Sequence, residues 1–295
     1  MSELFSNSTT EEVLTIGLIS DTHLPARRRS LPPLLPKIFA QVELILHAGD
    51  VGELSVLDAL SEIAPVVAVH GNDDSRTAQK ELPLQQLVVV AGWRLLLWHG
   101  HFQERAVEMA RRRDDRWEPK LVRLARRASA CDARIIVFGH MHIPLCHTTD
   151  DLLLINPGAL ASGNFYTRQR LQTVALLSLT PHSSPLVTHV DVTSGDAVEP
   201  SVEFALGFRQ ALDRVSESIV APDLLPYMEQ LRGIWREDRS HLERIFRELA
   251  FPCWEGEQEA INRRDVLRAI AKDDLLPDEV RQKLCALLES ETGAL

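Results

Sequence analysis

The 295-residue sequence contains few cysteines and no long apolar run. Its four cysteines, Cys131, Cys146, Cys253 and Cys285, are far apart in the chain and form no Cys-x-x-Cys pair, so we interpret them as reduced thiols. No apolar stretch approaches the roughly 20 residues that a membrane-spanning helix needs, and residues 1–12 lack the basic residues and apolar core of a signal peptide. We therefore expect a cytoplasmic protein that does not contact a membrane.

An excess of positive charge is also missing, since the net charge is −10. Residues 1–195 carry 21 acidic and 19 basic side chains, whereas residues 196–295 carry 21 and 13. This balance argues against a general attraction to the phosphate backbone of nucleic acids. Nucleic acid is therefore not favoured as a partner, although a local basic groove beside a cleft remains compatible with the composition.

Five short blocks hold seven residues of the types that ligate metals, and each block follows an apolar run of strand composition. The seven residues are Asp21 and His23 in SDTH, Asp50 in HAGD, Asn72 in HGNDD, His99 in WHGH, and His140 with His142 in FGHMH. The preceding runs are residues 13–19, 42–46, 65–69, 93–98 and 134–138. Because open α/β sheets gather ligands at the carboxyl ends of their strands, all five blocks can converge on one cleft.

Two of the blocks place ligands two residues apart, as Asp21 with His23 and His140 with His142. In an extended chain, residues at positions i and i+2 point to the same side. We therefore expect extended backbone at both pairs.

The ligand types indicate a centre of two divalent ions. Carboxylate and amide oxygens with imidazole nitrogens, and no thiolate, suit Mn²⁺, Fe, Zn²⁺ or Co²⁺. Seven ligands exceed what a single tetrahedral ion needs. They fit two ions about 3.5–4 Å apart that share a bridging carboxylate and clamp the attacking and leaving oxygens of phosphoryl transfer.

The order of the motifs, D-x-H, G-D, G-N-x-D, H-G-H, G-H-x-H and then NPG, resembles that of the calcineurin-like metallophosphoesterase superfamily. Within it the sequence is most similar to the YfcE-type phosphodiesterase group, over about residues 13–180. The resemblance implies a four-layer α/β/β/α sandwich of two mixed sheets. It also implies a metal-dependent phosphoesterase, in the first place a phosphodiesterase, in which a bridging hydroxide attacks the phosphorus.

The resemblance also implies a role for each motif residue. One ion would be held by Asp21, His23 and His142, the other by Asn72, His99 and His140, and Asp50 would bridge the two. We count Asp50, Asn72, His99 and Asp73 as catalytic residues. Mn²⁺ is the first expectation for both ions, with Fe, Zn²⁺, Co²⁺ or Ni²⁺ as alternatives.

Asp73 departs from the superfamily pattern, because many members carry there a His that is proposed to protonate the leaving group. An Asp, with an unperturbed pKa of about 3.9, is less suited to donating a proton at neutral pH. Trp98 and Ala159 also differ from the residues usual at their positions, but neither change removes a ligand.

Two further residues are candidates for binding the substrate phosphate. His101 lies two residues after His99 and could face the same cleft. Arg27 follows the first motif, and guanidinium groups suit bidentate phosphate recognition. Other arginines, between positions 111 and 127, are spread along a predicted helix, and we expect them to form a solvated face with Asp114, Asp115 and Glu118.

The expected substrate is a small phosphoester, with a nucleotide-like molecule as one candidate. The motifs do not distinguish diesters from monoesters, so a phosphomonoesterase or nuclease is an alternative function. A non-catalytic protein-binding scaffold of the same fold is a second alternative, and the retention of all seven ligands argues against it.

The chain is too long for the motif-bearing domain alone, and its pattern changes near residue 195. We predict a catalytic domain over residues 1–195 and a helical module over residues 196–295. Apolar residues in the second part recur every three or four positions, which predicts four or five short helices with Pro222, Pro252 and Pro277 as breaks. The module is expected to pack on the catalytic domain. Alternatively, it forms a homo-oligomer or partner interface, or a lid.

Overall fold

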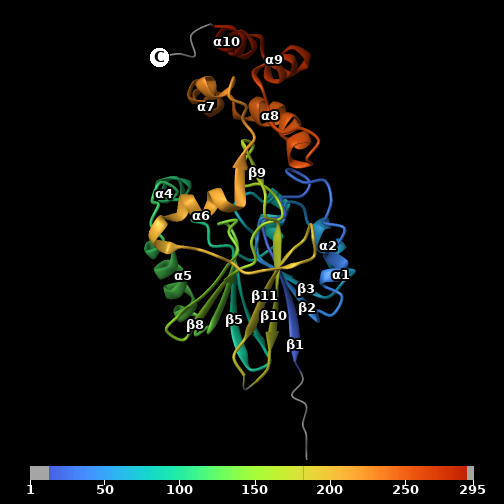
Figure 1. Cartoon of the computed structure of the whole chain (residues 1–295), viewed down its shortest axis with the longest axis vertical. Coiled ribbons are helices and arrows are strands. Elements are labelled where there is room, and N and C mark those ends of the chain that lie inside the picture. The colour runs from blue at the N-terminus through green and yellow to red at the C-terminus, as the bar shows by residue number, and fades with distance from the viewer. Residues whose placement is uncertain (1–12, 182, 291–295) are drawn as a thin grey trace, which may run out of the picture.

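The computed structural model describes residues 13–181 and 183–290, and these form two mixed β-sheets covered by helices, with a group of helices beyond one end of the sandwich (Figure 1). The four-layer α/β/β/α architecture expected from the sequence is confirmed. No helix in the described ranges is long and apolar enough to cross a membrane. The expected cytoplasmic location stays a prediction.

The first sheet has six strands. In spatial order they are β12 (Ala197–Val198), β11 (Leu186–Asp191), β10 (Thr173–Leu179), β1 (Leu14–Ile19), β2 (Leu44–His47) and β3 (Val66–Ala68). Strands β1, β2 and β3 are parallel, and β10 runs antiparallel to β1. The loops that follow the three parallel strands therefore lie at one edge of the sheet, and they carry the first three motifs.

The second sheet has five strands. In spatial order they are β4 (Gln85–Val90), β5 (Trp93–Trp98), β6 (Ile135–Phe138), β8 (Leu152–Asn156) and β7 (Leu145–Thr149). Strands β5, β6 and β8 are parallel. The H-G-H, G-H-x-H and NPG blocks follow these three strands, so the five predicted motif-bearing strands are confirmed, with limits within two residues of the expected runs.

Apolar side chains of the central strands pack on both faces of the sheets. Leu95 and Leu97 of β5 belong to the buried cluster between the two sheets, whereas Leu96 and Trp98 belong to the cluster under the outer helices. Residues of β6 alternate in the same way. Because successive side chains of a strand point to opposite faces, a fully apolar strand is what a sheet covered on both sides requires.

Helices cover the outer faces of the sandwich. Those of the first half are α1 (Leu35–Ile38), α2 (Ser55–Ser61) and α3 (Arg76–Glu81), and those over the second sheet are α4 (Arg105–Arg111), α5 (Glu118–Ala130) and α6 (Phe208–Val215). Leu35, Val56 and Leu60 pack α1 and α2 on β1 and β2. Leu124 of α5 and Ala211 of α6 share one buried cluster with β5 and β6.

Residues 197–218 contact the sandwich. Strand β12 extends the first sheet, α6 packs on α5, and β13 (Ser216–Ser218) pairs with β9 (Thr167–Gln169). The helices that share a separate apolar core begin later in the chain. The division expected at about residue 195 stays a prediction.

The C-terminal helices form their own apolar core. They are α7 (Met228–Glu237), α8 (Arg239–Trp254), α9 (Arg263–Lys272) and α10 (Asp278–Glu289), preceded by 3-10 turns at Phe204–Leu206 and Leu225–Tyr227. Leu231, Phe246 and Leu284 are fully buried there, and Phe165 of the sandwich joins the same cluster. The expected break at Pro252 is wrong, because α8 continues to Trp254. Only two residues of the helix follow Pro252, so little of the helix lies beyond the hydrogen bond that the proline cannot make.

Candidate metal centre

The ligand-bearing loops leave the strand ends through left-handed backbone. Positive φ angles occur at Asp21 (54°), His23 (47°), Asp50 (52°), His140 (67°) and His142 (58°). The expectation of extended backbone at the two i, i+2 pairs is therefore wrong. At each pair the backbone turns sharply, so that both side chains point into the same space. Such a conformation costs on the order of 1–3 kcal/mol and is concentrated at functional sites.

Backbone hydrogen bonds between the first two motifs hold this conformation. The amide of Asp21 donates to the carbonyl of Gly49 at 3.0 Å, and the amide of His23 donates to that of Asp50 at 3.0 Å. Glycine is required beside the ligands, because a Cβ on Gly49 would lie 2.7 Å from the His99 ring and one on Gly71 would lie 2.1 Å from Asp50 Oδ1. The G-D and G-N pairs therefore reflect close packing of the loops.

Three predicted ligands form one group of converging atoms. His142 Nε2 lies 3.1 Å from Asp21 Oδ1 and 3.4 Å from His23 Nε2, and His23 Nε2 lies 3.9 Å from Asp21 Oδ1. All three side chains are buried. A cation placed among these atoms would be within reach of all of them.

A second group forms around Asp50. Its Oδ2 lies 3.3 Å from His99 Nε2 and 3.7 Å from His23 Nε2, so one carboxylate oxygen lies between ligands of the two groups. Asn72 and His140 line the same cavity, and the His140 ring lies 5.1 Å from that of His99, centroid to centroid. The structure thus gathers all seven residues around one site, with Asp50 between the two groups.

Hydrogen bonds to the far side of each imidazole determine which nitrogen faces the site. His99 Nδ1 is 2.8 Å from the carbonyl of Ala48, and His142 Nδ1 is 3.0 Å from that of Ala161. A carbonyl can only accept, so each Nδ1 carries a proton and each Nε2 is the nitrogen that faces the site. Such partners fix the tautomer and orientation of metal-ligating histidines.

Burial and charge together favour a cation at this position. Burial alone would raise the pKa of Asp21, but neighbouring histidines lower it well below its usual range, and the same holds for Asp50. Burial alone would lower the pKa of His99, yet Asp50 and Asp21 raise it to about 10. The two buried carboxylates thus create a strong negative potential, which a divalent cation would neutralise.

The donor set fits divalent ions. Asn72 Oδ1 and His99 Nε2 are buried and make no well-directed hydrogen bond with any described residue. Buried polar atoms without partners are rare, so each calls for a missing partner. Both atoms belong to predicted ligands of the second ion, and an oxygen-and-nitrogen set without sulfur is typical of Mn²⁺, Zn²⁺ or Fe sites.

Asp73 and Arg27 form an ion pair at the edge of the site. Arg27 Nη2 lies 2.6 Å from Asp73 Oδ2, and Arg27 Nη1 donates to the carbonyl of Ser162 at 3.1 Å. Burial would raise the pKa of Asp73, but the guanidinium of Arg27 outweighs burial and lowers it. Asp73 is therefore an anion at neutral pH, and its backbone amide donates to Asp50 Oδ1 at 2.7 Å.

His101 lies behind the predicted ligands. It is 6% exposed, packs against His70, His99 and His140, and is not among the side chains that line the cavity. Burial lowers its pKa to about 3. This placement favours a packing role, and its contact with substrate stays a prediction.

Glu108 is a site residue that the sequence did not reveal. It comes from α4 and is buried, and its carboxylate lies 2.8 Å from His140 Nε2, accepts from Arg112 Nε at 2.8 Å and accepts from the amide of Phe102 at 3.0 Å. The bond to Nε2 leaves His140 Nδ1 for a metal. No local pattern marks Glu108, because its role depends on how α4 packs over the strand ends.

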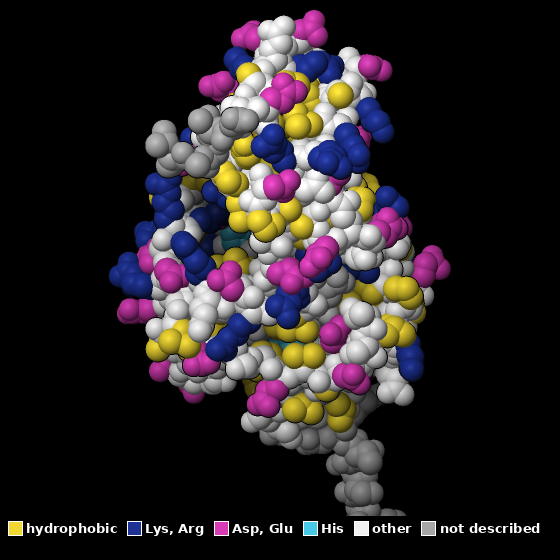
Figure 2. Space-filling view, turned by 45° about the horizontal axis from the view of Figure 1, so that its top comes forward, with side chains coloured by type: hydrophobic (Ala, Val, Ile, Leu, Met, Phe, Trp, Pro, Cys, Tyr) yellow, Lys and Arg dark blue, Asp and Glu magenta, His cyan; other side chains and the backbone are white. Residues whose placement is uncertain are grey.

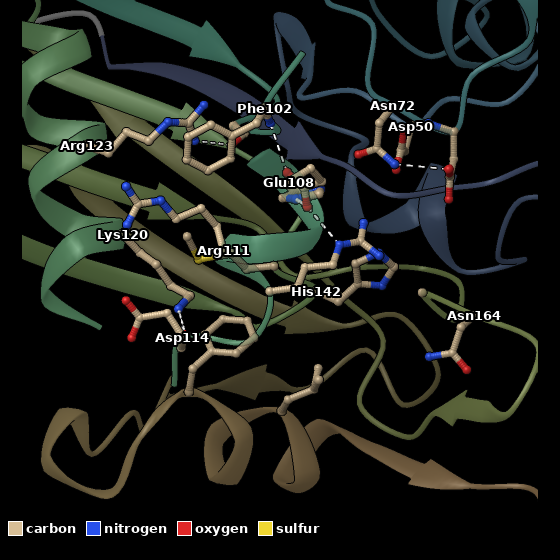
Figure 3. A pocket seen from close by; sticks show the side chains of 18 of the residues that line it. Asp50, Asn72, Phe102, Glu108, Arg111, Asp114, Lys120, Arg123, His142 and Asn164 are labelled. Atoms are coloured by element: carbon tan, nitrogen blue, oxygen red, sulfur yellow. Dashed lines mark hydrogen bonds and ion pairs between the residues drawn. The ribbon is translucent and has the colours of Figure 1, made fainter. Parts of the chain in front are cut away.

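The cavity beside these ligands has a volume of about 650 Å³. Its walls come from the motif loops on one side and from α4, α5 and α6 on the other, so that Asp50 and Asn72 lie across it from Lys120 and Arg123 (Figure 3). This size is within the range of pockets that bury a small organic ligand.

The chain is similar to proteins of known sequence and structure. A probable metallophosphoesterase of Methanothermobacter thermautotrophicus is 35% identical over 146 residues, 50% of this chain and 77% of that protein. A phosphodiesterase of Methanocaldococcus jannaschii is 26% identical over 161 residues, 49% of this chain and 83% of its own length. The structure of vacuolar protein sorting 29 from Cryptosporidium parvum has a TM-score of 0.49 at 18% identity, and covers 63% of this chain and 95% of that one.

Residues 14–181 match the calcineurin-like phosphoesterase superfamily domain, a range that includes every motif, the whole second sheet and strands β1, β2, β3 and β10 of the first. With buried ligand groups at the strand ends, the chain belongs to the calcineurin-like phosphoesterase superfamily, a family of metal-dependent phosphoester hydrolases.

Proposed function

We propose that this protein is a phosphodiesterase that uses two divalent metal ions, with Mn²⁺ as the first candidate. The observation that carries the proposal is the position of Asp50, whose Oδ2 lies 3.7 Å from His23 Nε2 and 3.3 Å from His99 Nε2. A carboxylate between two groups of ligands is the arrangement that a shared bridge requires. Two bound ions would supply an activated water and charge stabilisation for an in-line displacement at phosphorus.

The side chains of the site have distinct tasks in this proposal. Asp21, His23 and His142 hold one ion, and Asn72, His99 and His140 hold the other. The carbonyls of Ala48 and Ala161 keep two of the imidazoles in the ligating tautomer. Burial of the ligands excludes bulk water and so strengthens their interactions with charge.

Arg27 is proposed to bind a phosphoryl oxygen. Its guanidinium lies within 3.3 Å of the His23 ring nitrogens, and its side chain is 11% exposed. Because the partner Asp73 is an anion, it would orient Arg27 and would not protonate the leaving group. We therefore expect activity on diesters with good leaving groups, with slower turnover of poor ones.

The monoesterase, nuclease and scaffold alternatives are less well supported. A relative named phosphodiesterase aligns over about half of this chain, and no described feature favours a monoester. A scaffold would not need buried, unpartnered ligand atoms such as Asn72 Oδ1.

The test is hydrolysis of bis(p-nitrophenyl) phosphate by chelator-stripped protein with Mn²⁺ added back. Asp50→Asn should abolish the metal-stimulated rate. Asp58→Asn, the same change at an exposed position of α2, is the matched control and should keep that rate. Equal turnover by the Asp50 variant would remove the bridging role, and absence of turnover in folded, metal-loaded wild type would remove the proposed function.

A further inference from the structure

The cavity has a second wall whose chemistry the metal centre does not use. Lys120, Arg123 and Arg126 recur every three residues along α5, and Arg111 ends α4 beside them. All four line the same cavity as Asp50 and Asn72. Figure 2 shows Lys and Arg side chains gathered along the edge of a hollow in which histidine is visible. This local positive charge contrasts with the net charge of −10 of the chain.

The carboxylates that line the cavity are each paired with a residue other than these four cations. Asp50 contacts His99 and His23, and Asp73 pairs with Arg27. The other two belong to the helical side. Glu108 binds His140 and Arg112, and Asp114 binds Arg116 at 2.9 Å.

The four cations, in contrast, have no carboxylate partner among the described residues. Lys120 donates to the carbonyl of Arg116 at 3.0 Å and lies 4.8 Å above the Phe208 ring. Arg123 donates to the carbonyl of His101 at 2.8 Å and lies 3.7 Å above the Phe102 ring. The guanidinium groups of Arg111 and Arg126 make no hydrogen bond or ion pair within residues 13–181 and 183–290.

The expectation of a solvated arginine face is therefore wrong for Arg123. Its guanidinium is held between carbonyls and aromatic rings at the cavity wall, and burial lowers its pKa to about 10, so it remains charged at neutral pH. A cation that is partly desolvated and faces a cavity interacts more strongly with an anion than one in bulk water does.

Apolar side chains line the same cavity as this wall and the predicted metal ligands. Phe102, Met141, Phe208 and Leu212 line the cavity, and more of its lining is apolar than polar. At about 650 Å³ the cavity is much larger than a phosphoryl group needs. The space beyond the metal ligands therefore fits an organic group with an apolar or aromatic body.

We propose that the substrate is a nucleotide-type phosphodiester that carries a second phosphate, with its reacting phosphate at the metal ligands and its second phosphate at Arg111, Lys120 and Arg126. This inference rests on the proposed phosphodiesterase function. It adds a subsite on the α4–α5 wall, and the apolar side chains of the cavity would contact the nucleoside. Guanidinium groups recognise phosphate oxygens in a bidentate manner, which makes the two unpartnered arginines the main determinants.

The test compares two chromogenic substrates that differ by one phosphate, thymidine 5′-(p-nitrophenyl phosphate) and its 3′-phosphorylated analogue. We expect kcat/KM of the Mn²⁺-loaded wild type to be at least about tenfold higher for the phosphorylated substrate, the effect of one charge-assisted contact. The double variant Arg111→Ala/Arg126→Ala should reduce this ratio to near one. The matched control Arg105→Ala/Arg113→Ala changes two exposed arginines of the same segment that do not line the cavity, and should keep the ratio.

Equilibrium binding separates this inference from the proposed function. Wild-type protein should bind thymidine 3′,5′-bisphosphate at least about tenfold more tightly than thymidine 5′-monophosphate, and the double variant should not. Turnover of both substrates at equal kcat/KM would overturn the subsite while leaving the phosphodiesterase intact. So would a preference that survives in the double variant. Failure of folded, metal-loaded protein to turn over either substrate would overturn the phosphodiesterase. In that case equal binding of the two nucleotides would overturn the subsite as well.

Discussion

Glu108 should control the affinity of the second metal position through His140. Its carboxylate lies 2.8 Å from His140 Nε2 and is buried with two further donors, the amide of Phe102 and the guanidinium of Arg112. Glu108→Gln keeps the size of the side chain and removes its charge. The imidazole then loses its anionic acceptor and becomes a weaker and less well oriented ligand.

The magnitude follows from the role of such partners in known metal sites. Loss of a hydrogen-bonding partner behind a ligand typically costs about 10- to 100-fold in metal affinity, or about 1.4–2.7 kcal/mol. We expect one of the two binding steps to weaken by this factor and the other to stay unchanged, because Asp21, His23 and His142 make no hydrogen bond with Glu108.

The assay is titration of chelator-stripped protein with Co²⁺, followed by visible absorption, and with Mn²⁺, followed by calorimetry. Glu104→Gln is the matched control, since this exposed residue precedes the same helix and undergoes the same loss of charge. Denaturant unfolding without metal separates lost stability from lost affinity. Two unchanged binding steps in a folded Glu108→Gln protein would refute the reasoning.

Three further results are expected. Asp73→Asn should lower hydrolysis of bis(p-nitrophenyl) phosphate by less than about tenfold, a change of about 1.4 kcal/mol, because Asp73 is an anion paired with Arg27; a loss of several orders of magnitude would contradict this. Burial lowers the pKa of His47 to about 4, whereas its pKa in the unfolded chain is about 6.5. The folded state therefore favours the neutral imidazole, and the free energy of unfolding should fall as the pH is lowered from 6.5 toward 4. In denaturant unfolding without metal, His47 should change the free energy of unfolding by up to about 1.4 kcal/mol per pH unit over this range. The same pH dependence in His47→Gln would rule out a contribution from His47. Phe246→Ala should lower the free energy of unfolding by about 3–5 kcal/mol, because this ring is fully buried in the core of the C-terminal helices; a loss under about 1 kcal/mol would contradict such packing.

The strands that carry the site could be predicted because their signal is local. Each apolar run before a motif is long enough for a strand and too short for a helix, and each became part of a sheet that is covered on both faces. The order of the motifs then predicted the convergence of their loops, which the described chain shows.

The backbone of those loops could not be predicted from spacing. Residues such as Asp21 and His140 adopt positive φ because contacts between loops hold them there, and local preference alone would disfavour it. Glu108 and Arg123 were missed for a related reason. They reach the site only through the packing of α4 and α5 against the strand ends, and an isolated helix pattern does not contain that information.

The helical periodicity of the C-terminal part predicted helices but not their limits. Residues from Phe204 to Ile219 fit one helical repeat, yet Gly207, with φ 90°, separates a 3-10 turn from α6, and Ser216–Ser218 pairs with β9. Sheet pairing with a distant strand overrode the local pattern there. The contact of Phe165 with the C-terminal core was likewise not predictable, because it joins segments far apart in sequence.

The most direct test of the central claim is the rate of bis(p-nitrophenyl) phosphate hydrolysis as Mn²⁺ is added in measured equivalents to stripped protein. If Asp50 bridges two ions, the rate should rise until two equivalents per chain are bound and then stay constant. Asp50→Asn should bind less than two equivalents and show no metal-stimulated rate. Full activity at one bound equivalent, or activity independent of metal, would contradict a two-metal phosphodiesterase.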